Sequence, residues 1–534
     1  DRLEHGIQSI YSLRGCSSNN FNPFIALKRE NCNEYAGEVL GFSFVYSGNF
    51  LAQVEVDTYD VTRVMMGIHP HCFSWSLEKG ESFQTPEVVM VYSNDGLNKM
   101  SQTYHKLYQR RLARGKYRDQ VRPILVNNWE ATYFDFDEEK IMDIAGTAQK
   151  LGIELFVLDD GWFGKRNNDV AGLGDWYPNL QKLPSGISGL SRKINNLGMK
   201  FGLWFEPEMV NKNSDLYRNH PQWILETPNR PSSHGRNQFV LDFSNPEVVI
   251  YVYNMMTEVI DKANISYIKW DMNRCMTEVY SSCHDSESQG RVMHEYILGV
   301  YQLYELLTSR FPEILFESCA SGGARFDPGM MYYAPQCWTS DDTDALERLK
   351  IQYGTSMVYP VSSLGAHVSA APNHQLLRNT PIETRANVAY FGTFGYELDL
   401  NKLSMDEQIK VKEQITFMKD YREIIQFGTF YRLKSPFEGN ETVWMVVSQD
   451  QNTAIIGYYR TLQEVNVGYR RVKLLGLDPD KEYHVNLNNT VHYGDELMNL
   501  GLITTDSSCG ENKEKYDGTN GDYLSRIYVL KAKI

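Results

Sequence analysis

The sequence predicts an α/β protein in which a central (β/α)8 barrel lies between two β domains. Between about residues 122 and 425, short apolar runs alternate with amphipathic helical stretches, whereas the flanking regions show short β-type runs separated by turns. Apolar strands alternating with helices indicate a parallel sheet, and eight of them in roughly 300 residues fit one closed barrel. We therefore expect a partial N-terminal β-sandwich with a linker helix over residues 1–118, the barrel over residues 119–430, and a C-terminal β-sandwich over residues 431–534.

The N-terminal part is expected to be mainly β-structure. The runs 42–47 and 51–56 flank a Gly-Asn pair, which is a turn signal that predicts a hairpin. Residues 88–92 form a further expected strand. Residues 100–112 have the pattern of a helix, which would link this part to the barrel.

Eight runs are expected to form the barrel. They are residues 124–129, 155–160, 200–206, 238–242, 267–271, 314–318, 337–341 and 361–367. Amphipathic stretches such as residues 138–151 and 294–310 separate most of them. A doubly wound open sheet is the alternative, but it would carry a glycine-rich phosphate turn after its first strand. Here that position reads Asn-Asn-Trp-Glu, at residues 127–130.

The C-terminal part returns to short β-type runs. Residues 442–448, 453–459, 471–477 and 482–487 are expected strands with turn signals between them, which predicts a small antiparallel sandwich.

Composition excludes two classes of protein and favours one compartment. The net charge is −14, from 53 basic and 67 acidic residues, which is the opposite of the balance that a nucleic-acid-binding protein needs. No apolar run reaches 18 residues, so no membrane-spanning helix is expected. The 8 cysteines are scattered without framework spacing, which favours reduced thiols and a cytoplasmic protein.

Polar and aromatic residues gather where the expected barrel strands end, the position at which barrel enzymes place their chemistry. They are Trp129, Asp159, Asp160, Trp204, Glu206, Glu208, Arg236, Asp242, Lys269, Asp271, Glu317, Cys319, Gly322, Gly323, Trp338, Asp341 and His367. A single aspartate in such a place more often caps a helix, and we assign Asp342 and Asp344 to capping. Because buried charges are costly unless they are paired or used, the whole set indicates a functional site.

These residue types suit cleavage of a glycosidic bond. One carboxylate, Asp271, would attack or stabilise the anomeric carbon, and a protonated carboxyl, Asp341, would donate to the leaving oxygen. Lysine and further aspartates would hold sugar hydroxyls, and tryptophan would pack on the apolar sugar face. A metal site built from Asp159, Asp160 and Asp271 is the rival, but the charge of Lys269 would repel a cation. No phosphate-loop, serine-elbow or zinc-helix motif occurs, so we expect no cofactor.

Six segments of the barrel resemble, in order, the microbial α-galactosidases of glycoside hydrolase family 36. They are residues 158–164 (Leu-Asp-Asp-Gly-Trp-Phe-Gly), 203–208 (Leu-Trp-Phe-Glu-Pro-Glu), 269–274 (Lys-Trp-Asp-Met-Asn-Arg), 317–319 (Glu-Ser-Cys), 321–323 (Ser-Gly-Gly) and 338–341 (Trp-Thr-Ser-Asp). The C-terminal part looks similar as well. The resemblance implies a cofactor-free enzyme that removes terminal α-linked galactose from sugars such as raffinose or melibiose.

The resemblance also implies roles for individual residues. Asp271 would be the nucleophile of a retaining mechanism and Asp341 the acid/base, with their carboxyls about 5–6 Å apart. For substrate binding, the family pattern places Asp159 and Asp160 at the galactose O4 and O6, and Lys269 and Arg236 at the neighbouring hydroxyls. It places three tryptophans, Trp129, Trp204 and Trp338, at the pocket wall. Cys319 and Gly322 would lie near O2.

Three other readings stay open on the same scaffold. An α-N-acetylgalactosaminidase would need more room around Cys319 and Gly322. A transglycosylase would let an acceptor sugar compete with water for one intermediate. A carbohydrate-binding barrel without activity is the non-enzyme alternative, which the presence of both Asp271 and Asp341 disfavours.

The chain departs from the family pattern in two places. Family members usually begin with a larger N-terminal β-sandwich, so we expect this chain to enter that domain partway, as a truncation would. In the family that domain contributes to oligomers, often tetramers, so a homo-oligomer is expected. Ala320 and Ala324 stand beside the Gly-Gly turn where Ser and Gly are expected, which leaves the substrate preference on the O2 side open.

Overall fold

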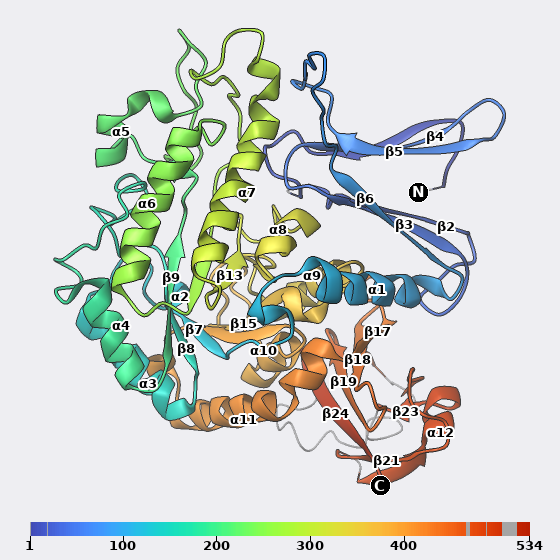
Figure 1. Ribbon diagram of the computed structural model, residues 1–534. Helices are drawn as coiled ribbons and strands as arrows, with labels where there is room; N and C mark the ends of the chain where they lie inside the picture. The colour runs from blue at the N-terminus through green and yellow to red at the C-terminus, as the bar shows by residue number, and fades with distance from the viewer. Residues whose placement is uncertain (1, 19, 466–469, 488, 505–520, 534) are drawn as a thin grey trace.

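A closed barrel of eight parallel strands forms the centre of the molecule (Figure 1). The computed structural model describes residues 2–18, 20–465, 470–487, 489–504 and 521–533. The barrel strands are β7 (Leu125–Asn127), β8 (Leu155–Leu158), β9 (Lys200–Phe205), β12 (Tyr267–Trp270), β13 (Leu315–Ser318), β14 (Gln336–Trp338), β15 (Leu364–Ser369) and β16 (Thr393–Glu397). The barrel closes where β16 pairs with β7, and the predicted fold class is confirmed.

Of the eight predicted barrel strands one is wrong, and one strand of the barrel was not predicted. The run 238–242 forms only the short strand β11 (Phe239–Val240), which pairs antiparallel with β10 (Met209–Val210) outside the barrel. The eighth barrel strand is instead β16, which the prediction missed. Its sequence, Thr-Phe-Gly-Tyr-Glu, has too few apolar residues to read as a buried strand, yet every residue in it is buried. The barrel interior accepts it because Gly395 leaves room for the ring of His367 on β15.

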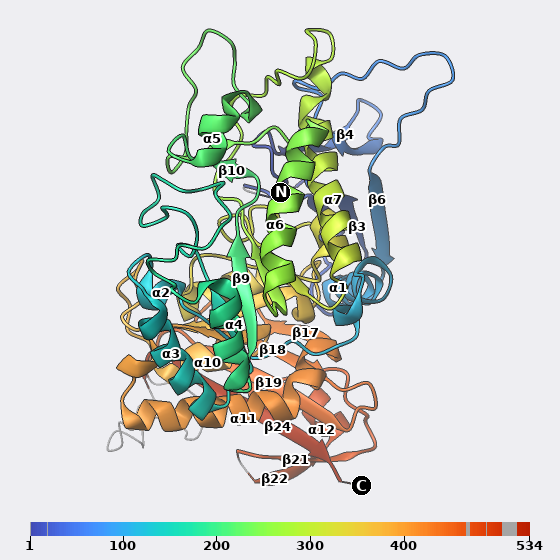
Figure 2. The same cartoon turned by 60° about the vertical axis from the view of Figure 1, so that its left-hand side comes forward.

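Helices surround the barrel, and side-chain caps fix where several of them begin. The longer ones are α3 (Glu138–Leu151), α4 (Gly186–Asn196), α6 (Pro246–Lys262), α7 (Val292–Arg310), α9 (Ala345–Thr355), α10 (Ile382–Ala389) and α11 (Met405–Phe427), and short turns form α2 (Trp129–Thr132), α5 (Asp215–Asn219) and α8 (Pro328–Tyr333). Figures 1 and 2 show α6 and α7 side by side along one flank. Asp344 caps α9 as predicted, by accepting from the backbone N–H of Leu346. Asp342 does not cap the helix, since it accepts from the N–H of Asp344 and stabilises the turn before it.

The N-terminal region forms two antiparallel sheets of three strands. One contains β1 (Gly6–Tyr11), β4 (Phe50–Val56) and β5 (Thr62–Ile68), and the other contains β2 (Phe24–Lys28), β3 (Val39–Val45) and β6 (Glu87–Ser93). The predicted hairpin is wrong, because its two strands, β3 and β4, belong to different sheets. At the crossing between them Gly48 packs against Ile297, and the Asn49 side chain accepts from the N–H of Gly15 at 2.8 Å. The predicted linker helix is present as α1 (Gly96–Leu107), continued by one wider helical turn over Tyr108–Leu112.

The C-terminal region is a six-stranded antiparallel sheet with a smaller two-stranded sheet. The strand order of the larger sheet is β17 (Thr429–Lys434), β18 (Glu441–Val447), β19 (Thr453–Arg460), β24 (Leu524–Ala532), β21 (Glu482–Val485) and β22 (Thr490–Tyr493). In the smaller sheet β20 (Arg471–Val472) pairs with β23 (Leu502–Ile503). The short helix α12 (Gly494–Asn499) lies beside β22. The predicted strand 471–477 is therefore much shorter than expected. Of the eight cysteines, Cys509 lies outside the described residues, and the others form no disulfide. None of the helices in the described part of the chain combines the length and apolar character that crossing a membrane requires.

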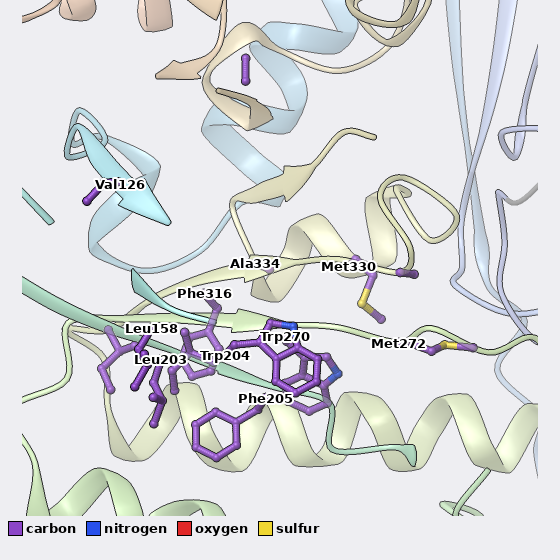
Figure 3. Packing of buried hydrophobic residues seen from close by; sticks show 14 of the residues in the cluster. Val126, Leu158, Leu203, Trp204, Phe205, Trp270, Met272, Phe316, Met330 and Ala334 are labelled. Atoms are coloured by element: carbon purple, nitrogen blue, oxygen red, sulfur yellow. The ribbon is translucent and has the colours of Figure 1, made fainter. Parts of the chain in front are cut away.

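Apolar side chains of the barrel strands alternate between the barrel interior and the surrounding helices. Below the polar strand ends, the barrel residues Leu125, Leu155, Val157, Tyr267 and Leu315 form one buried cluster. Leu158, Leu203 and Phe316, grouped in Figure 3, belong to the larger cluster that includes the helices. Trp270 stacks on Tyr304 of α7 with ring centroids 3.9 Å apart and donates its indole N–H to Glu208. This close packing leaves the polar strand ends as the place where a ligand can enter.

Candidate active site

A small polar pocket opens at the carboxyl ends of the barrel strands. Its volume is about 130 Å³, comparable with the roughly 150 Å³ cavities that take up one six-membered ring. It is lined by Trp129, Glu130, Asp159, Asp160, Trp204, Arg236, Lys269, Asp271, Asn273, Trp338, Asp341, Thr343, His374, Gln375 and Glu397. Every residue to which the family resemblance assigned a role, except Cys319 and Gly322, is in this lining. Those two lie just behind it: the Cys319 thiol bonds to Asp271, and Gly322 packs against the backbone of Ser340 and Asp341.

Asp271 follows directly after β12 and is held by hydrogen-bond donors from several segments. Its Oδ2 accepts from the indole N–H of Trp204 at 3.2 Å and from the Asn273 amide at 2.7 Å, and its Oδ1 accepts from the Met272 N–H at 2.8 Å. Burial opposes ionisation, but the Lys269 charge and the bonds from Cys319 and Asn273 hold the pKa of Asp271 below its usual value. Asp271 is therefore an ionised, fixed carboxylate at neutral pH.

Asp341 lies three residues after β14 in surroundings that favour its protonated form. Its Oδ1 accepts from the Trp338 indole N–H at 3.0 Å. Burial, reinforced by the negative charge of Asp271, raises the pKa of Asp341 to about 6. This is the elevation that the sequence predicts. The pocket thus holds one ionised carboxylate and one carboxyl that titrates close to neutral pH.

The neighbouring carboxylates are each paired with a buried cation. Lys269 Nζ lies 3.0 Å from Asp159 Oδ2, which also accepts from the Asn127 amide at 2.6 Å. Arg166 donates to both oxygens of Asp160, to Oδ1 at 3.0 Å and to Oδ2 at 2.8 Å, and its side chain is fully buried. The charges that a metal ion would use are thus bound to Lys269 and Arg166. Within the described ranges, no group of three His, Cys, Asp or Glu side chains is arranged to hold a metal.

Arg236 reaches the pocket from a backbone arch before β11. Both Arg236 and Asn237 adopt left-handed φ angles, +51° and +59°, which side chains other than glycine rarely accept. The Asn237 carbonyl accepts from the Asn211 amide at 2.8 Å, which holds the arch. The next residue, Gln238, donates to buried Glu206 at 3.0 Å. The run 238–242 therefore serves to place Arg236 rather than to extend the barrel.

Buried glutamate completes the surroundings of the Asp271 segment. The N–H of Asn273 donates to Glu206 Oε1 at 2.5 Å. Burial and the nearby Asp271 charge raise the pKa of Glu206 to about 8, so this carboxyl is neutral at pH 7.

The other strand-end residues have structural partners outside the pocket. Glu208 forms a bidentate ion pair with Arg325, whose two terminal guanidinium nitrogens lie 2.6 and 2.8 Å from the two carboxylate oxygens. Asp242 accepts from the N–H of Ser244 at 3.1 Å, and Glu317 accepts from the Gln336 amide at 2.7 Å.

Comparison with known proteins matches most of the chain to one family. Residues 82–428 match the model of the melibiase domain, residues 1–78 that of the glycosyl hydrolase family 36 N-terminal domain, and residues 441–530 that of the family 36 C-terminal domain. The chain belongs to glycoside hydrolase family 36. The family and the activity class expected from the sequence, an α-galactosidase, are confirmed.

Among its relatives, this family 36 chain is similar to α-galactosidase AgaA of Geobacillus stearothermophilus, with 57% identity over 99% of this chain and 71% of the relative. It is 46% identical to α-galactosidase Mel36A of Lactobacillus acidophilus over its full length, which covers 71% of that protein. The crystal structure of AgaA superposes with a TM-score of 0.96 and 56% identity, over 99% of this chain and 72% of that one.

Six pocket residues of this glycosidase were not among the predicted site residues: Glu130, Asn273, Thr343, His374, Gln375 and Glu397. Asn273 lies two residues after Asp271 in the same sequence motif, so the sequence could have predicted that it lies in the pocket. His374 and Gln375 lie in a loop after β15 that has no strand or helix pattern, and Glu397 ends the strand that was missed. The His374 ring lies 3.4 Å from Glu130, and Thr343 donates to the same carboxylate at 2.9 Å, so these residues form one rim.

Proposed function

We propose that the protein is a retaining exo-α-galactosidase that releases terminal galactose through a covalent galactosyl-enzyme. The observation that carries this is the pairing of an ionised Asp271 with a protonatable Asp341 across a pocket that fits one ring. Crystal structures of AgaA variants are described in complex with raffinose and with stachyose. We extend that substrate class, together with melibiose, to this chain.

In the first step Asp271 Oδ2 or Oδ1 attacks the anomeric carbon and the bond to the leaving oxygen breaks. Asp341 gives its proton to that oxygen, so the departing sugar leaves as a neutral alcohol. In the second step the Asp341 carboxylate takes a proton from water, which attacks the same carbon and releases Asp271. Two inversions give net retention. Trp204, Asn273 and Met272 keep the Asp271 carboxylate from rotating, which stabilises the near-attack geometry.

The remaining predicted residues are proposed to bind the galactose. Asp159 and Asp160, fixed by Lys269 and Arg166, present acceptor oxygens to O4 and O6. Lys269 and Arg236 contact the neighbouring hydroxyls. The indoles Trp129, Trp204 and Trp338 form the wall, and Cys319 and Gly322 limit the space near O2.

The test is hydrolysis of a panel of aryl α-glycosides by the wild-type protein and by Asp271→Ala. We expect fast turnover of the α-galactoside, little of the α-N-acetylgalactosaminide, and a loss of roughly 10³-fold or more in the variant. Azide should rescue Asp271→Ala to give the β-galactosyl azide, and Asp341→Ala to give the α-galactosyl azide. Asp261→Ala, at an exposed position of α6, is the control and should behave as wild type. Preference for the N-acetylgalactosaminide, or rescue with the opposite stereochemistry, would refute the assignment.

We further propose the domain division 1–118, 119–430 and 431–534, a homo-oligomeric assembly that is a tetramer by resemblance to the family, and a cytoplasmic location. The three family matches support a division into three parts, with the first boundary at residues 78–82 rather than at 118 and the second between residues 428 and 441. The absence of disulfides among the described cysteines supports a reducing compartment. Light scattering coupled to size-exclusion chromatography tests the assembly, since a monomer mass would contradict it.

A further inference from the structure

Glu397 lines the pocket and is the last residue of β16, the barrel strand that the sequence prediction missed. Its side chain is 3% exposed, and it lies among the pocket residues. One oxygen lies 3.0 Å from Nδ1 of His367 on the neighbouring strand β15. Burial opposes its ionisation, but the His367 bond and the charges of Lys269 and Arg348 hold the pKa of Glu397 below its ordinary value. The carboxylate is therefore charged, and His367 donates to it through Nδ1–H.

The His367 ring connects this carboxylate to the pocket wall. It packs against the indole of Trp338 with ring centroids 4.4 Å apart. Two glycines make room for the pair of rings. A Cβ on Gly395 would lie 2.8 Å from the His367 ring, and a Cβ on Gly365 would lie 3.0 Å from the Trp338 ring. The backbone of two adjacent strands is thus shaped around this contact.

Trp338 in turn holds Asp341. Its indole N–H donates to Asp341 Oδ1 at 3.0 Å, and the Arg348 guanidinium lies 4.5 Å from its ring centroid. Arg348 is itself fixed by backbone carbonyls, including Gly365 at 2.8 Å. An indole keeps a hydrogen bond directed at one carboxyl oxygen only if its ring does not tilt, and the contact with the His367 ring restricts that tilt.

We propose that Glu397 and His367 are positioning residues, which act through Trp338 to hold the Asp341 carboxyl in place for proton transfer. The inference rests on the proposed function, because it assigns Asp341 to acid/base catalysis. Glu397 touches neither reacting atom in this scheme. Its role is to fix the imidazole, and through it the indole, in one orientation.

The charge of Glu397 gives a second effect that an experiment can separate from simple folding. Several charged or titratable groups face Asp341. The negative charges of Asp271 and Glu397 favour its protonated form, and the positive charges of Lys269 and Arg348 oppose it. The Cys319 thiol faces it as well. Removing the Glu397 charge therefore lowers the pKa of Asp341. Because the protonated acid is the active form, the basic limb of kcat/KM moves to lower pH.

The test compares two substrates with different needs for an acid. Raffinose has a poor leaving group that must be protonated, whereas a nitrophenyl α-galactoside leaves with little help. General acid catalysis contributes roughly 10²- to 10⁴-fold, so we expect Glu397→Gln and His367→Phe to lower kcat/KM for raffinose about tenfold and for the aryl substrate less than threefold. In Glu397→Gln the basic limb of the kcat/KM profile should also lie a few tenths of a pH unit lower than in the wild type. Glu317→Gln, a buried glutamate on β13 outside the pocket, is the matched control.

Three outcomes overturn the proposal. Equal losses on both substrates with an unmoved basic limb would make the pair merely structural. A rise in KM with unchanged kcat would make Glu397 a direct ligand of the sugar. The same leaving-group pattern in Glu317→Gln would make the effect general. Asp341→Ala is measured in parallel. If its loss of kcat/KM is not larger for raffinose than for the aryl substrate, the acid/base assignment fails. If that larger loss for raffinose occurs in Asp341→Ala alone, only the role of Glu397 and His367 is refuted.

Discussion

Two chemically identical side chains acquire opposite protonation preferences in this pocket because their partners differ. Asp271 receives hydrogen bonds and faces Lys269, whereas Asp341 is buried beside the negative charge that Asp271 carries. At the scale of single residues, the environment therefore makes one carboxylate a nucleophile and the other an acid.

The first prediction concerns the pH dependence of activity. Because the pKa of Asp341 is raised to about 6, the acid is protonated below that pH and loses its proton above it. We expect kcat/KM to fall above about pH 6 and to hold on the acidic side until Asp271, whose pKa is lowered, is protonated. A pH–rate profile on raffinose, whose leaving group must be protonated, checks this. If kcat/KM did not change between about pH 5 and pH 9 by more than the assay error, the assignment of Asp341 would be contradicted.

The second prediction concerns Gly322, whose φ is +79°. A Cβ there would lie 2.6 Å from Ser340 Cα and 2.7 Å from the Asp341 N atom, so Gly322→Ala must push the acid/base segment aside. We expect kcat/KM to fall about tenfold or more, since a displacement of about 1 Å at a reacting group is that costly. Gly354→Ala in α9 is the control, because its Cβ would meet nothing within 4 Å. Equal activity of the two variants would refute the steric argument.

At the scale of elements, the barrel strands deliver their last residues to the pocket, while a buried polar network ties strands to helices. Glu208, which follows β9, binds Arg325 and also accepts from Trp270 of β12 and Tyr296 of α7. Arg325 is 1% exposed and Glu208 is fully buried. The orientation of the strand that leads to Asp271 thus depends on a charge pair behind it.

The third prediction follows from that pair. Glu208→Gln leaves the Arg325 charge buried without a counter-charge, which costs roughly 3–5 kcal/mol of unfolding free energy. Urea denaturation followed by circular dichroism measures the loss as a lower midpoint. Glu258→Gln, which breaks an exposed pair with Lys262 on α6, should change stability by at most about 0.5 kcal/mol. Similar midpoints for the two variants would show that Glu208 is not structurally important.

At the scale of the whole molecule, one arginine joins segments that are far apart in the sequence. Arg432 of β17 is fully buried and holds both oxygens of Glu34, at 3.0 and 2.9 Å. The same guanidinium donates to Ser101 of α1 and to the carbonyl of Ser356 after α9. The N-terminal region, the linker helix, the barrel and the C-terminal sheet therefore share one polar contact.

The fourth prediction tests that junction. Glu34→Gln removes the counter-charge of Arg432, and we expect a loss of about 2–4 kcal/mol, less than for Glu208 because Glu34 is partly exposed. Thermal unfolding should begin at a lower temperature while kcat/KM at 25 °C stays unchanged, because the junction is remote from the pocket. Glu38→Gln, at an exposed pair with Arg29, is the control. An unchanged transition in Glu34→Gln would mean that the four segments are held by apolar packing alone.

The sequence by itself determined the barrel, the β regions on either side and the acidic strand ends, because each depends on local periodicity and on residue type. Apolar runs at regular spacing predict a parallel sheet whatever their partners, and carboxylates beside tryptophans at strand ends indicate sugar chemistry. Asp271 and Asp341 could be named for that reason.

Only the tertiary structure decided which strand closes the barrel, how Arg236 enters the pocket and which loops form its rim. β16 is a strand because its neighbours β15 and β7 pair with it, not because its residues are apolar. The β3–β4 hairpin fails for the related reason that Gly48 and Asn49 bind distant segments. The protonation of Asp341 was likewise foreseeable in direction, but its partners Trp338, Glu397 and Arg348 come from separate elements, and contacts between such elements are fixed by packing in three dimensions.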